Sequence, residues 1–282
     1  MQSFKMKYGP WALITGASSG IGKALAQQLA AQGFDVVLVA RTESVLNKLA
    51  SELQEKHSIN TRVIAADLSQ TGAVDALYDS VSTLDIGLVI PAAGIDEMGR
   101  FLDKEYADLN KMLTLNVNVP TEIAHVFGRK LVAREHSGII LVASLFGYQG
   151  IPNFAGYAAS KAYILTLGET LNVELARKNV DVLVLSPGLT DTPFSQSMAI
   201  DFGKLPMFAQ RPEYVASVAL SSLGHKSTVV SGLLNKIYAW ENRLIPRSWP
   251  VKLFGFLIDR AIKSYQTKQA RAAAAVSSSD KY

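Results

Sequence analysis

The chain has 282 residues, of which 49% are hydrophobic and 18% charged, with a formal net charge of +4. This length suits one large α/β domain, or one domain with an appendage. The absence of cysteine excludes disulfides, thiolate catalysis and Cys-ligated metals. We expect no metal site. We expect no secretory signal, because no apolar segment follows the first ten residues before the first strand. We expect no membrane-spanning helix, because no apolar run approaches roughly 18 residues.

The positive charge is concentrated at the C-terminal end. Residues 241–282 contain eight Lys or Arg and three Asp or Glu, so this tail carries +5 and the rest of the chain −1. A nearly neutral body without a basic helix does not favour nucleic-acid binding. A cysteine-free chain of this kind is compatible with the cytoplasm.

Short apolar runs alternate with longer helical patterns, which indicates βαβ units around a parallel sheet. We predict strands at 11–15, 35–40, 61–65, 87–91, 138–143, 180–185 and near 228–232. We predict helices at 20–32, 43–56, 71–82, 108–134, 155–178 and 211–223, with a kink or break near Pro120. The fold class is therefore α/β: a Rossmann-type, doubly wound parallel sheet of about seven strands with helices on both faces.

A glycine-rich turn joins the first strand to the first helix. Glycine at such a junction allows the backbone to approach a pyrophosphate, whose charge the helix N-terminus stabilises. A purely structural turn is the alternative, and the strand–turn–helix context argues against it. The candidate cofactor-binding residues of the turn are Gly16, Ser18, Ser19, Gly20, Ile21 and Gly22.

Arg41 follows the second strand, where a dinucleotide site meets the adenosine ribose. A guanidinium suits a 2′-phosphate, whereas an acidic residue would favour the 2′-hydroxyl, so we expect NADP(H) in preference to NAD(H). The alternative is a solvated surface arginine. Asp67 and Leu68 follow the third strand, and Asp67 either accepts a hydrogen bond from the adenine amino group or caps the next helix.

Tyr157 and Lys161 are four residues apart, so both side chains lie on one face of a helix. An ammonium beside a phenol favours the phenolate, and we expect it to lower the pKa of Tyr157. Such a tyrosine can donate and accept a proton near neutral pH.

Several motifs together resemble the short-chain dehydrogenase/reductase family over roughly residues 9–235. They are Gly16-x3-Gly20-x-Gly22, Asn116, Ser144, Tyr157-x3-Lys161 and Pro187-Gly188, in the family's order and spacing. The resemblance implies that Tyr157 is the acid/base, that Lys161 lowers the pKa of Tyr157 and binds the nicotinamide ribose, and that Ser144 orients the substrate carbonyl. It also implies that Asn116 holds a water that relays protons to Lys161.

The resemblance further implies nicotinamide contacts from Pro187, Gly188, Thr190 and Thr192, and a homodimer or homotetramer formed through the helices at 108–134 and 155–178. The sequence departs from the family at Pro91-Ala92-Ala93-Gly94, where Asn-Asn-Ala-Gly is usual. The hydrogen bonds made there must therefore differ, although cofactor approach through Ala93 and Gly94 is still expected. Asn116 has an alternative role in satisfying backbone groups near Pro120.

We divide the chain into a catalytic domain at 1–235, with a lid region at 191–211, and a C-terminal extension at 236–282. The extension is a basic amphipathic helix from Pro250, with an end expected to fray from Ala270. We favour arrangements in which this helix packs on its own domain, roofs the substrate pocket or docks on a second subunit. Peripheral membrane contact, with Trp240 and Trp249 as anchors, is the alternative.

The sequence thus predicts an NADPH-dependent carbonyl reductase, or in reverse an alcohol dehydrogenase. The Phe- and Met-containing lid and the apolar tail favour a lipophilic ketone or secondary alcohol, such as a 3-oxoacyl chain or a steroid-like molecule. The alternative is a non-catalytic NADP-binding scaffold or redox sensor, although such a protein has no use for Tyr157 and Lys161 as a pair.

Overall fold

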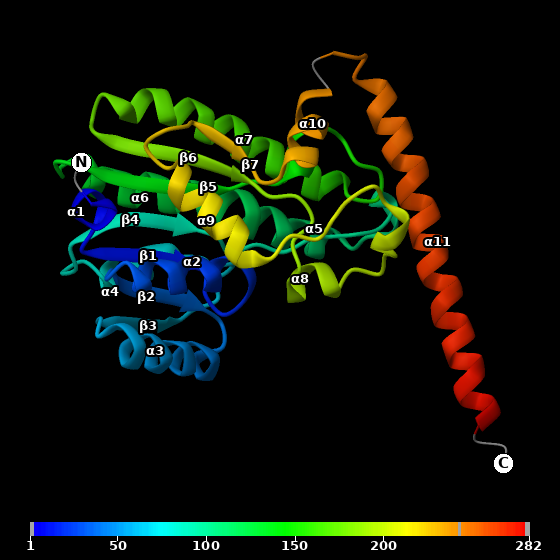
Figure 1. Ribbon diagram of the computed structural model, residues 1–282, viewed down its shortest axis with the longest axis horizontal. Helices are drawn as coiled ribbons and strands as arrows, with labels where there is room; N and C mark the ends of the chain where they lie inside the picture. Colours follow the sequence, from blue (N-terminus) through cyan, green and yellow to red (C-terminus); the bar gives the residue numbers. More distant parts are fainter. Residues whose placement is uncertain (1–2, 242–243, 280–282) are drawn as a thin grey trace.

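The computed structural model describes residues 3–241 and 244–279, with side chains as far as Ala273. Its centre is a parallel sheet of seven strands, as predicted. The strand order is β3-β2-β1-β4-β5-β6-β7 (Figure 1). The strands are β1 (Trp11–Thr15), β2 (Asp35–Ala40), β3 (Thr61–Ala65), β4 (Ile86–Pro91), β5 (Ser137–Val142), β6 (Val180–Ser186) and β7 (Thr228–Val230).

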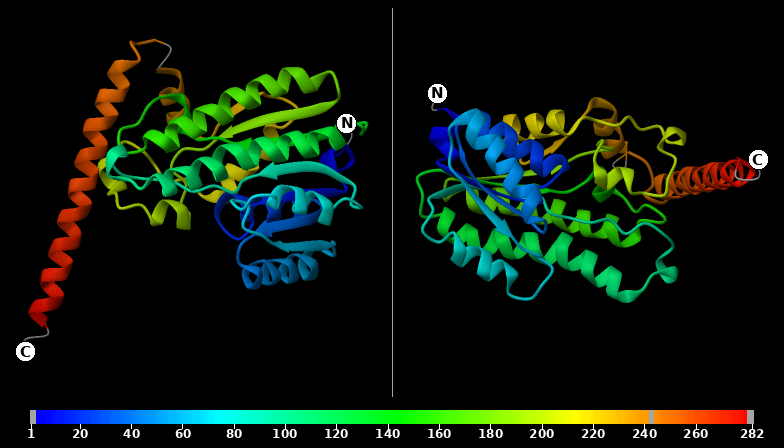
Figure 2. Two further views of the ribbon diagram at one scale, coloured as in Figure 1. Left: turned by 180° about the vertical axis from the view of Figure 1, so that it is seen from behind. Right: turned by 90° about the horizontal axis from the view of Figure 1, so that it is seen from below.

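Helices cover both faces of the sheet, because alternate side chains of each buried strand point to opposite faces. In β2, for example, Val36 and Leu38 join one core cluster while Val37 and Val39 join the other. The first face carries α1 (Phe4–Tyr8), α2 (Gly20–Ala31), α3 (Glu43–His57) and α9 (Pro212–Ser222). The opposite face carries α4 (Ala73–Ser80), α6 (Val119–Leu131) and α7 (Ala155–Ala176) (Figure 2).

The strand order reverses between β1 and β4. β1 pairs with β2 on one side and with β4 on the other, and the chain leaves these strands toward opposite faces. Such a switch point leaves a crevice at the carboxyl ends of the strands, where open α/β sheets bind ligands. The N-terminus of α2 lies at this crevice.

The helix predicted at 108–134 is interrupted, as expected. It forms α5 (Tyr106–Leu113), a π-helical turn η2 (Thr114–Asn118) and then α6. Pro120 lies in the first turn of α6, where a missing N–H costs little. The irregular turn precedes the proline and contains Asn116.

Beyond β6 the chain differs from a plain α/β repeat. The region 191–211 contains α8 (Pro193–Gln196) and a single 3-10 turn, η4 (Phe202–Lys204). The short helices α1 and α10 (Leu233–Glu241) were not predicted.

The predicted C-terminal helix is α11 (Ser248–Ser279), which lies across the end of the domain where the strands terminate (Figure 1). Residues 270–279, which we expected to fray, continue the helix, and residues 280–282 lie outside the described residues. Among the described residues, no helix is both long and apolar enough to cross a membrane.

A third apolar cluster lies apart from the two faces of the sheet. It is assembled from residues 151–158, from the region after β6 and from α11, and its fully buried members include Phe154, Ile258 and Ala261. The packing of α11 on its own domain, one of the expected arrangements, therefore holds for the inner side of the helix.

Candidate active site

A cavity of about 320 Å³ opens at the carboxyl ends of the central strands. Every predicted cofactor-binding residue contributes to its wall. These residues are Gly16, Ser18, Ser19, Gly20, Ile21, Gly22, Arg41, Asp67, Leu68, Ala93, Gly94, Tyr157, Lys161, Pro187, Gly188, Thr190 and Thr192. Ser144 lines it too, whereas Asn116 does not.

The glycine turn forms one end of this cavity. Gly16 has φ +67°, a left-handed conformation that favours glycine. A Cβ on Gly22 would lie 2.4 Å from the Gly16 carbonyl oxygen, so only glycine allows this turn to close. Ser19 precedes α2 without a side-chain capping bond, which leaves the N–H groups of the first turn without that partner. The turn can therefore receive a pyrophosphate.

Arg41 and Asp67 line the cavity just after the carboxyl ends of β2 and β3. The exposed Arg41 directly follows β2, and it makes no salt bridge within the part of the chain that the structure describes. The Asp67 carboxylate accepts hydrogen bonds from Ser69 Oγ (2.7 Å) and the Ser69 N–H (3.0 Å), which lower its pKa. Asp67 does not cap α4, which begins after Gly72.

The altered segment after β4 is held by a different hydrogen bond. The Ala93 N–H donates to Thr15 Oγ1 at 3.0 Å, so a hydroxyl on β1, rather than an asparagine amide, joins the ends of these strands. This bond leaves Ala93 and Gly94 on the cavity wall, as expected from the sequence.

Asn116 is buried behind the cavity wall. Its Oδ1 accepts from the Ile95 N–H at 3.0 Å and its Nδ2 donates to the Ile95 carbonyl at 2.7 Å. A Cβ on Gly94 would lie 3.0 Å from Asn116 Oδ1 and 3.7 Å from Lys161 Nζ, so both polar groups approach the same glycine. Asn116 thus satisfies backbone groups, at the loop after β4 rather than near Pro120.

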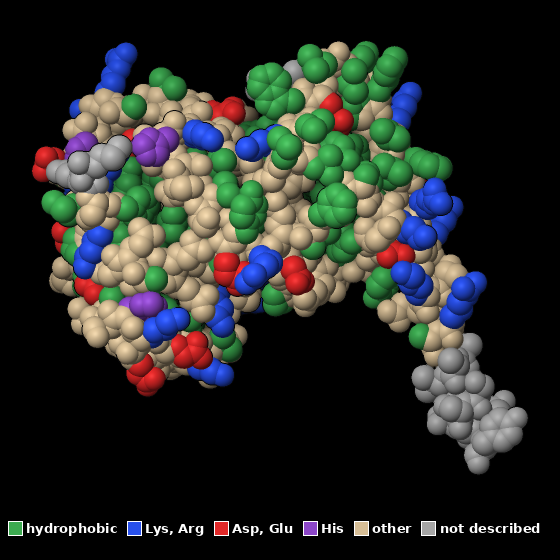
Figure 3. All heavy atoms as spheres, viewed as in Figure 1, with side chains coloured by type: hydrophobic (Ala, Val, Ile, Leu, Met, Phe, Trp, Pro, Cys, Tyr) green, Lys and Arg blue, Asp and Glu red, His purple; other side chains and the backbone are tan. Residues whose placement is uncertain are grey.

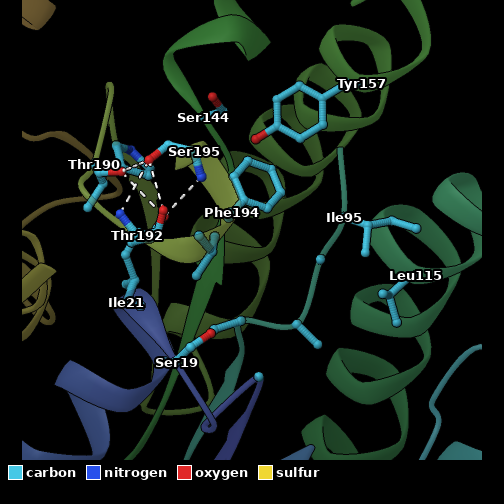
Figure 4. A pocket seen from close by; sticks show the side chains of 18 of the residues that line it. Ser19, Ile21, Ile95, Leu115, Ser144, Tyr157, Thr190, Thr192, Phe194 and Ser195 are labelled. Carbon is cyan, nitrogen blue, oxygen red and sulfur yellow. Dashed lines mark hydrogen bonds between the residues drawn. The ribbon is translucent and has the colours of Figure 1, made fainter. Parts of the chain in front are cut away.

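Tyr157 and Lys161 extend from one face of α7 into the cavity. Lys161 Nζ lies 5.7 Å from the centroid of the Tyr157 ring and donates to the Val142 carbonyl at 3.0 Å. Figure 4 shows the Tyr157 hydroxyl pointing into the space bordered by Ser144 and Phe194. Ser144 follows β5 and accepts a hydrogen bond from the Phe146 N–H. Two hydroxyl groups from different elements thus face one volume.

The electrostatics of the pair differ from the sequence-based expectation. Burial raises the pKa of Tyr157 to about 12, and this effect exceeds the lowering by its hydrogen bond with Ser144. Burial also lowers the pKa of Lys161 to about 8. The expected lowering of the Tyr157 pKa by Lys161 is therefore wrong for this arrangement, because desolvation dominates the shift and Lys161 is not among the groups that act on it. The nearby Asp96, whose own pKa burial raises, further disfavours the phenolate.

We expect Lys161→Met to stabilise the fold near neutral pH. The unfolded chain binds more protons than the folded chain between the lowered pKa of about 8 and the usual 10.5, so Lys161 costs stability below this window. After allowing for the lost bond to Val142, we expect the free energy of unfolding to rise by about 1–2 kcal/mol. The measurement is urea denaturation at several pH values.

The gain should shrink as the pH rises through the same window, since wild-type Lys161 then loses its proton in both states. The exposed Lys178 provides the control, and Lys178→Met should show no such pH dependence. A gain that is constant across the window would contradict the assignment of the cost to a buried charge.

The other end of the cavity is apolar. Its lining residues are Phe146, Phe154, Phe194, Met198, Ile200, Phe202, Met207 and Ile258. The predicted lid region 191–211 contains five Phe and Met residues. Four of them line the cavity, whereas the fifth, Phe208, is exposed and lies outside the lining. Ile258 comes from α11, so the tail forms part of the cavity wall.

Several lining residues were not found from the sequence. Phe146 lies in a short 3-10 helix (Leu145–Tyr148) and Phe154 directly precedes α7. Only their closeness to Ser144 and Tyr157 in the sequence could have indicated them. Ser195 belongs to a capping box, in which its N–H donates to Thr192 Oγ1 at 3.3 Å. Thr192 also packs on the glycine turn, since a Cβ on Gly20 would lie 3.0 Å from its methyl group.

Comparisons with known proteins agree with this geometry. The family model for short chain dehydrogenases matches residues 10–201. A 7beta-hydroxysteroid dehydrogenase from Clostridium sardiniense is 34% identical over 91% of this chain and 98% of its own. A very-long-chain 3-oxoacyl-CoA reductase from Podospora anserina is 32% identical over 91% of this chain and 72% of its own.

Solved structures show the same fold. A short-chain dehydrogenase from Sphingobium yanoikuyae, solved in complex with NADPH, superposes with a TM-score of 0.75 at 27% identity, covering 84% of this chain and 93% of that one. The fold and the cavity define a Rossmann-type oxidoreductase that acts on CH–OH or C=O groups. The chain belongs to the short-chain dehydrogenase family.

Proposed function

We propose that the protein is an NADPH-dependent carbonyl reductase, or in reverse an alcohol dehydrogenase, acting on a lipophilic ketone or secondary alcohol. One observation carries the proposal. The hydroxyls of Tyr157 and Ser144 face a cavity that has a glycine turn at one end and apolar side chains at the other. A carbonyl placed between these ends meets two hydrogen-bond donors, where hydride addition builds negative charge.

In this proposal Tyr157 is the proton donor to the carbonyl oxygen and Ser144 orients that oxygen. Burial keeps Tyr157 protonated at neutral pH, which suits an acid in the direction of reduction. Lys161 binds the nicotinamide ribose, and Asn116 supports Lys161 through the Gly94 segment or a water. The bound cofactor supplies the hydride.

The cofactor proposal depends on the shape and charge of the adenosine end. The close approach of Gly22 to Gly16 makes a cradle for a pyrophosphate, and Arg41 suits a 2′-phosphate. The glycine turn, Asp67, Leu68, Ala93, Gly94 and the segment from Pro187 to Thr192 would hold the rest of NADP(H). NADPH in the Sphingobium yanoikuyae structure supports this preference.

The apolar end of the cavity supports a lipophilic substrate. The names of the relatives point to two kinds of molecule, a steroid bearing a 7β-hydroxyl and a long 3-oxoacyl thioester. Both present a ketone or alcohol on an apolar skeleton, which fits a wall built from aromatic, Met and Ile side chains.

The test is oxidation of NADPH, followed by its absorbance, with a panel of steroid ketones, 3-oxoacyl thioesters and simple bulky ketones. We expect turnover with at least one lipophilic ketone and little with small polar ones. Binding of NADPH without turnover across the panel would contradict the proposal and favour the non-catalytic scaffold or redox sensor.

The location and assembly of the protein are further parts of the proposal. The absence of cysteine supports a cytoplasmic enzyme, and the basic tail supports a peripheral contact with a membrane. Family resemblance supports a homodimer or homotetramer formed through α5, α6 and α7. Gel filtration with light scattering measures this assembly directly. The division into a catalytic domain at 1–235 and an extension at 236–282 stays a prediction.

A further inference from the structure

The two C-terminal helices expose large apolar side chains on their outer sides. On α10 these are Leu233, Ile237 and Trp240, and on α11 they are Trp249, Leu253 and Phe256. We call these six residues the outer apolar face. Both triplets have the spacing i, i+4, i+7, which places each triplet along one side of its helix. Each of the six side chains is at least 56% exposed.

The inner side of α11 is already occupied. Phe254, Ile258 and Ala261 are buried in the third apolar cluster, and Ile258 reaches the cavity wall. The outer residues of α11 therefore cannot turn inward without removing this packing. The connection between the helices adds two further exposed apolar residues, Leu244 and Ile245.

Cations border the outer apolar face. They are the exposed residues Lys236, Arg247, Lys252, Arg260 and Lys263. Two acids lie among them in the described part of this region, Glu241 and Asp259, and Asp259 accepts a hydrogen bond from Asn153 at 2.9 Å. Figure 3 shows hydrophobic side chains gathered over α10 and the start of α11, with Lys and Arg following along α11.

We propose that the outer apolar face docks on an anionic phospholipid surface. Trp, Leu and Phe side chains insert at the boundary between headgroups and acyl chains, and neighbouring Lys and Arg side chains attract acidic headgroups. The excess of Lys and Arg over Asp and Glu around the outer apolar face favours an anionic lipid surface. A second copy of the chain would bring the same cations together, at a cost in repulsion. This surface is separate from the proposed reaction, and vesicle binding measures it without substrate.

The test is flotation of the full-length protein with vesicles of phosphatidylcholine alone or mixed with phosphatidylglycerol. We expect binding to the mixed vesicles that weakens as salt is raised. Leu253→Glu should reduce binding at least about tenfold, because it replaces an inserted apolar side chain with a charge of the lipid's own sign. Lys252→Ala should reduce binding to mixed vesicles about fivefold and leave binding to phosphatidylcholine unchanged.

Met6→Glu is the matched control. Met6 is 71% exposed on α1, which lies at the other end of the domain from α11, so this variant should bind like wild type. Unchanged NADPH binding by Leu253→Glu establishes that it folds. Failure of the wild type to float with mixed vesicles, or undiminished binding by Leu253→Glu, overturns the proposal. The proposal is also overturned if the wild type binds no vesicles but forms a dimer, and if Leu253→Glu converts this dimer to monomers.

Discussion

Tyr157→Phe is expected to reduce kcat by roughly 10³-fold while leaving NADPH affinity within a few-fold of wild type. The substitution removes the hydroxyl that points into the cavity and keeps the buried ring, which packs against Phe146 and Phe194. In the proposed mechanism, loss of the Tyr157 hydroxyl leaves Ser144 as the main donor to the developing oxyanion. Steady-state kinetics and fluorescence titration with NADPH measure the two effects separately.

Tyr163→Phe provides the control on the same helix. Tyr163 is partly exposed, its hydroxyl lies 3.4 Å from Thr121 Oγ1, and it does not line the cavity. This variant should keep wild-type turnover. Turnover by Tyr157→Phe at the wild-type rate would exclude Tyr157 as the acid, whichever ketone is the substrate.

Arg41→Asp is expected to reverse the cofactor preference. We expect kcat/KM for NADPH to fall roughly 100-fold, because the guanidinium is replaced by a charge that repels the 2′-phosphate. The value for NADH should rise, since a carboxylate at the end of β2 can accept a hydrogen bond from the 2′-hydroxyl. The measurement is kcat/KM with both cofactors at one saturating ketone concentration.

Arg62→Asp is the matched control for charge. Arg62 is exposed on β3 and does not line the cavity, so this variant should keep the wild-type ratio of NADPH to NADH. Equal losses with both cofactors in Arg41→Asp would contradict the role assigned to Arg41. Such losses would indicate that the arginine supports the adenosine end in another way.

Most of the sheet could be predicted because its central strands are apolar along most of their length, whereas the edge strand β3 carries the exposed Arg62. Runs such as Val36 to Val39 are buried on both faces, so their composition alone identifies them. The glycine turn and the pair formed by Tyr157 and Lys161 could be found for a similar reason. Each depends on the spacing of residues within one turn or one helix, and this spacing can be read directly from the sequence.

The features that escaped prediction depend on contacts between distant segments. Ile258 reaches the cavity from α11, about a hundred residues along the chain from Tyr157. No local sequence pattern indicates that these two residues line the same cavity. The sign of the Tyr157 pKa shift was wrong because spacing shows the neighbouring lysine but not the depth of burial. Asp96, which also acts on Tyr157, lies in a loop without a periodic pattern.

The separation of the third apolar cluster from the two faces of the sheet has an evolutionary consequence. Phe154, Ile258 and their neighbours shape the apolar end of the cavity without entering the packing that holds β1 to its partners. Substitutions there can accumulate without weakening the nucleotide-binding half. The same sheet can therefore carry cavities whose apolar ends differ in shape, when the last helix and the segment after β6 differ.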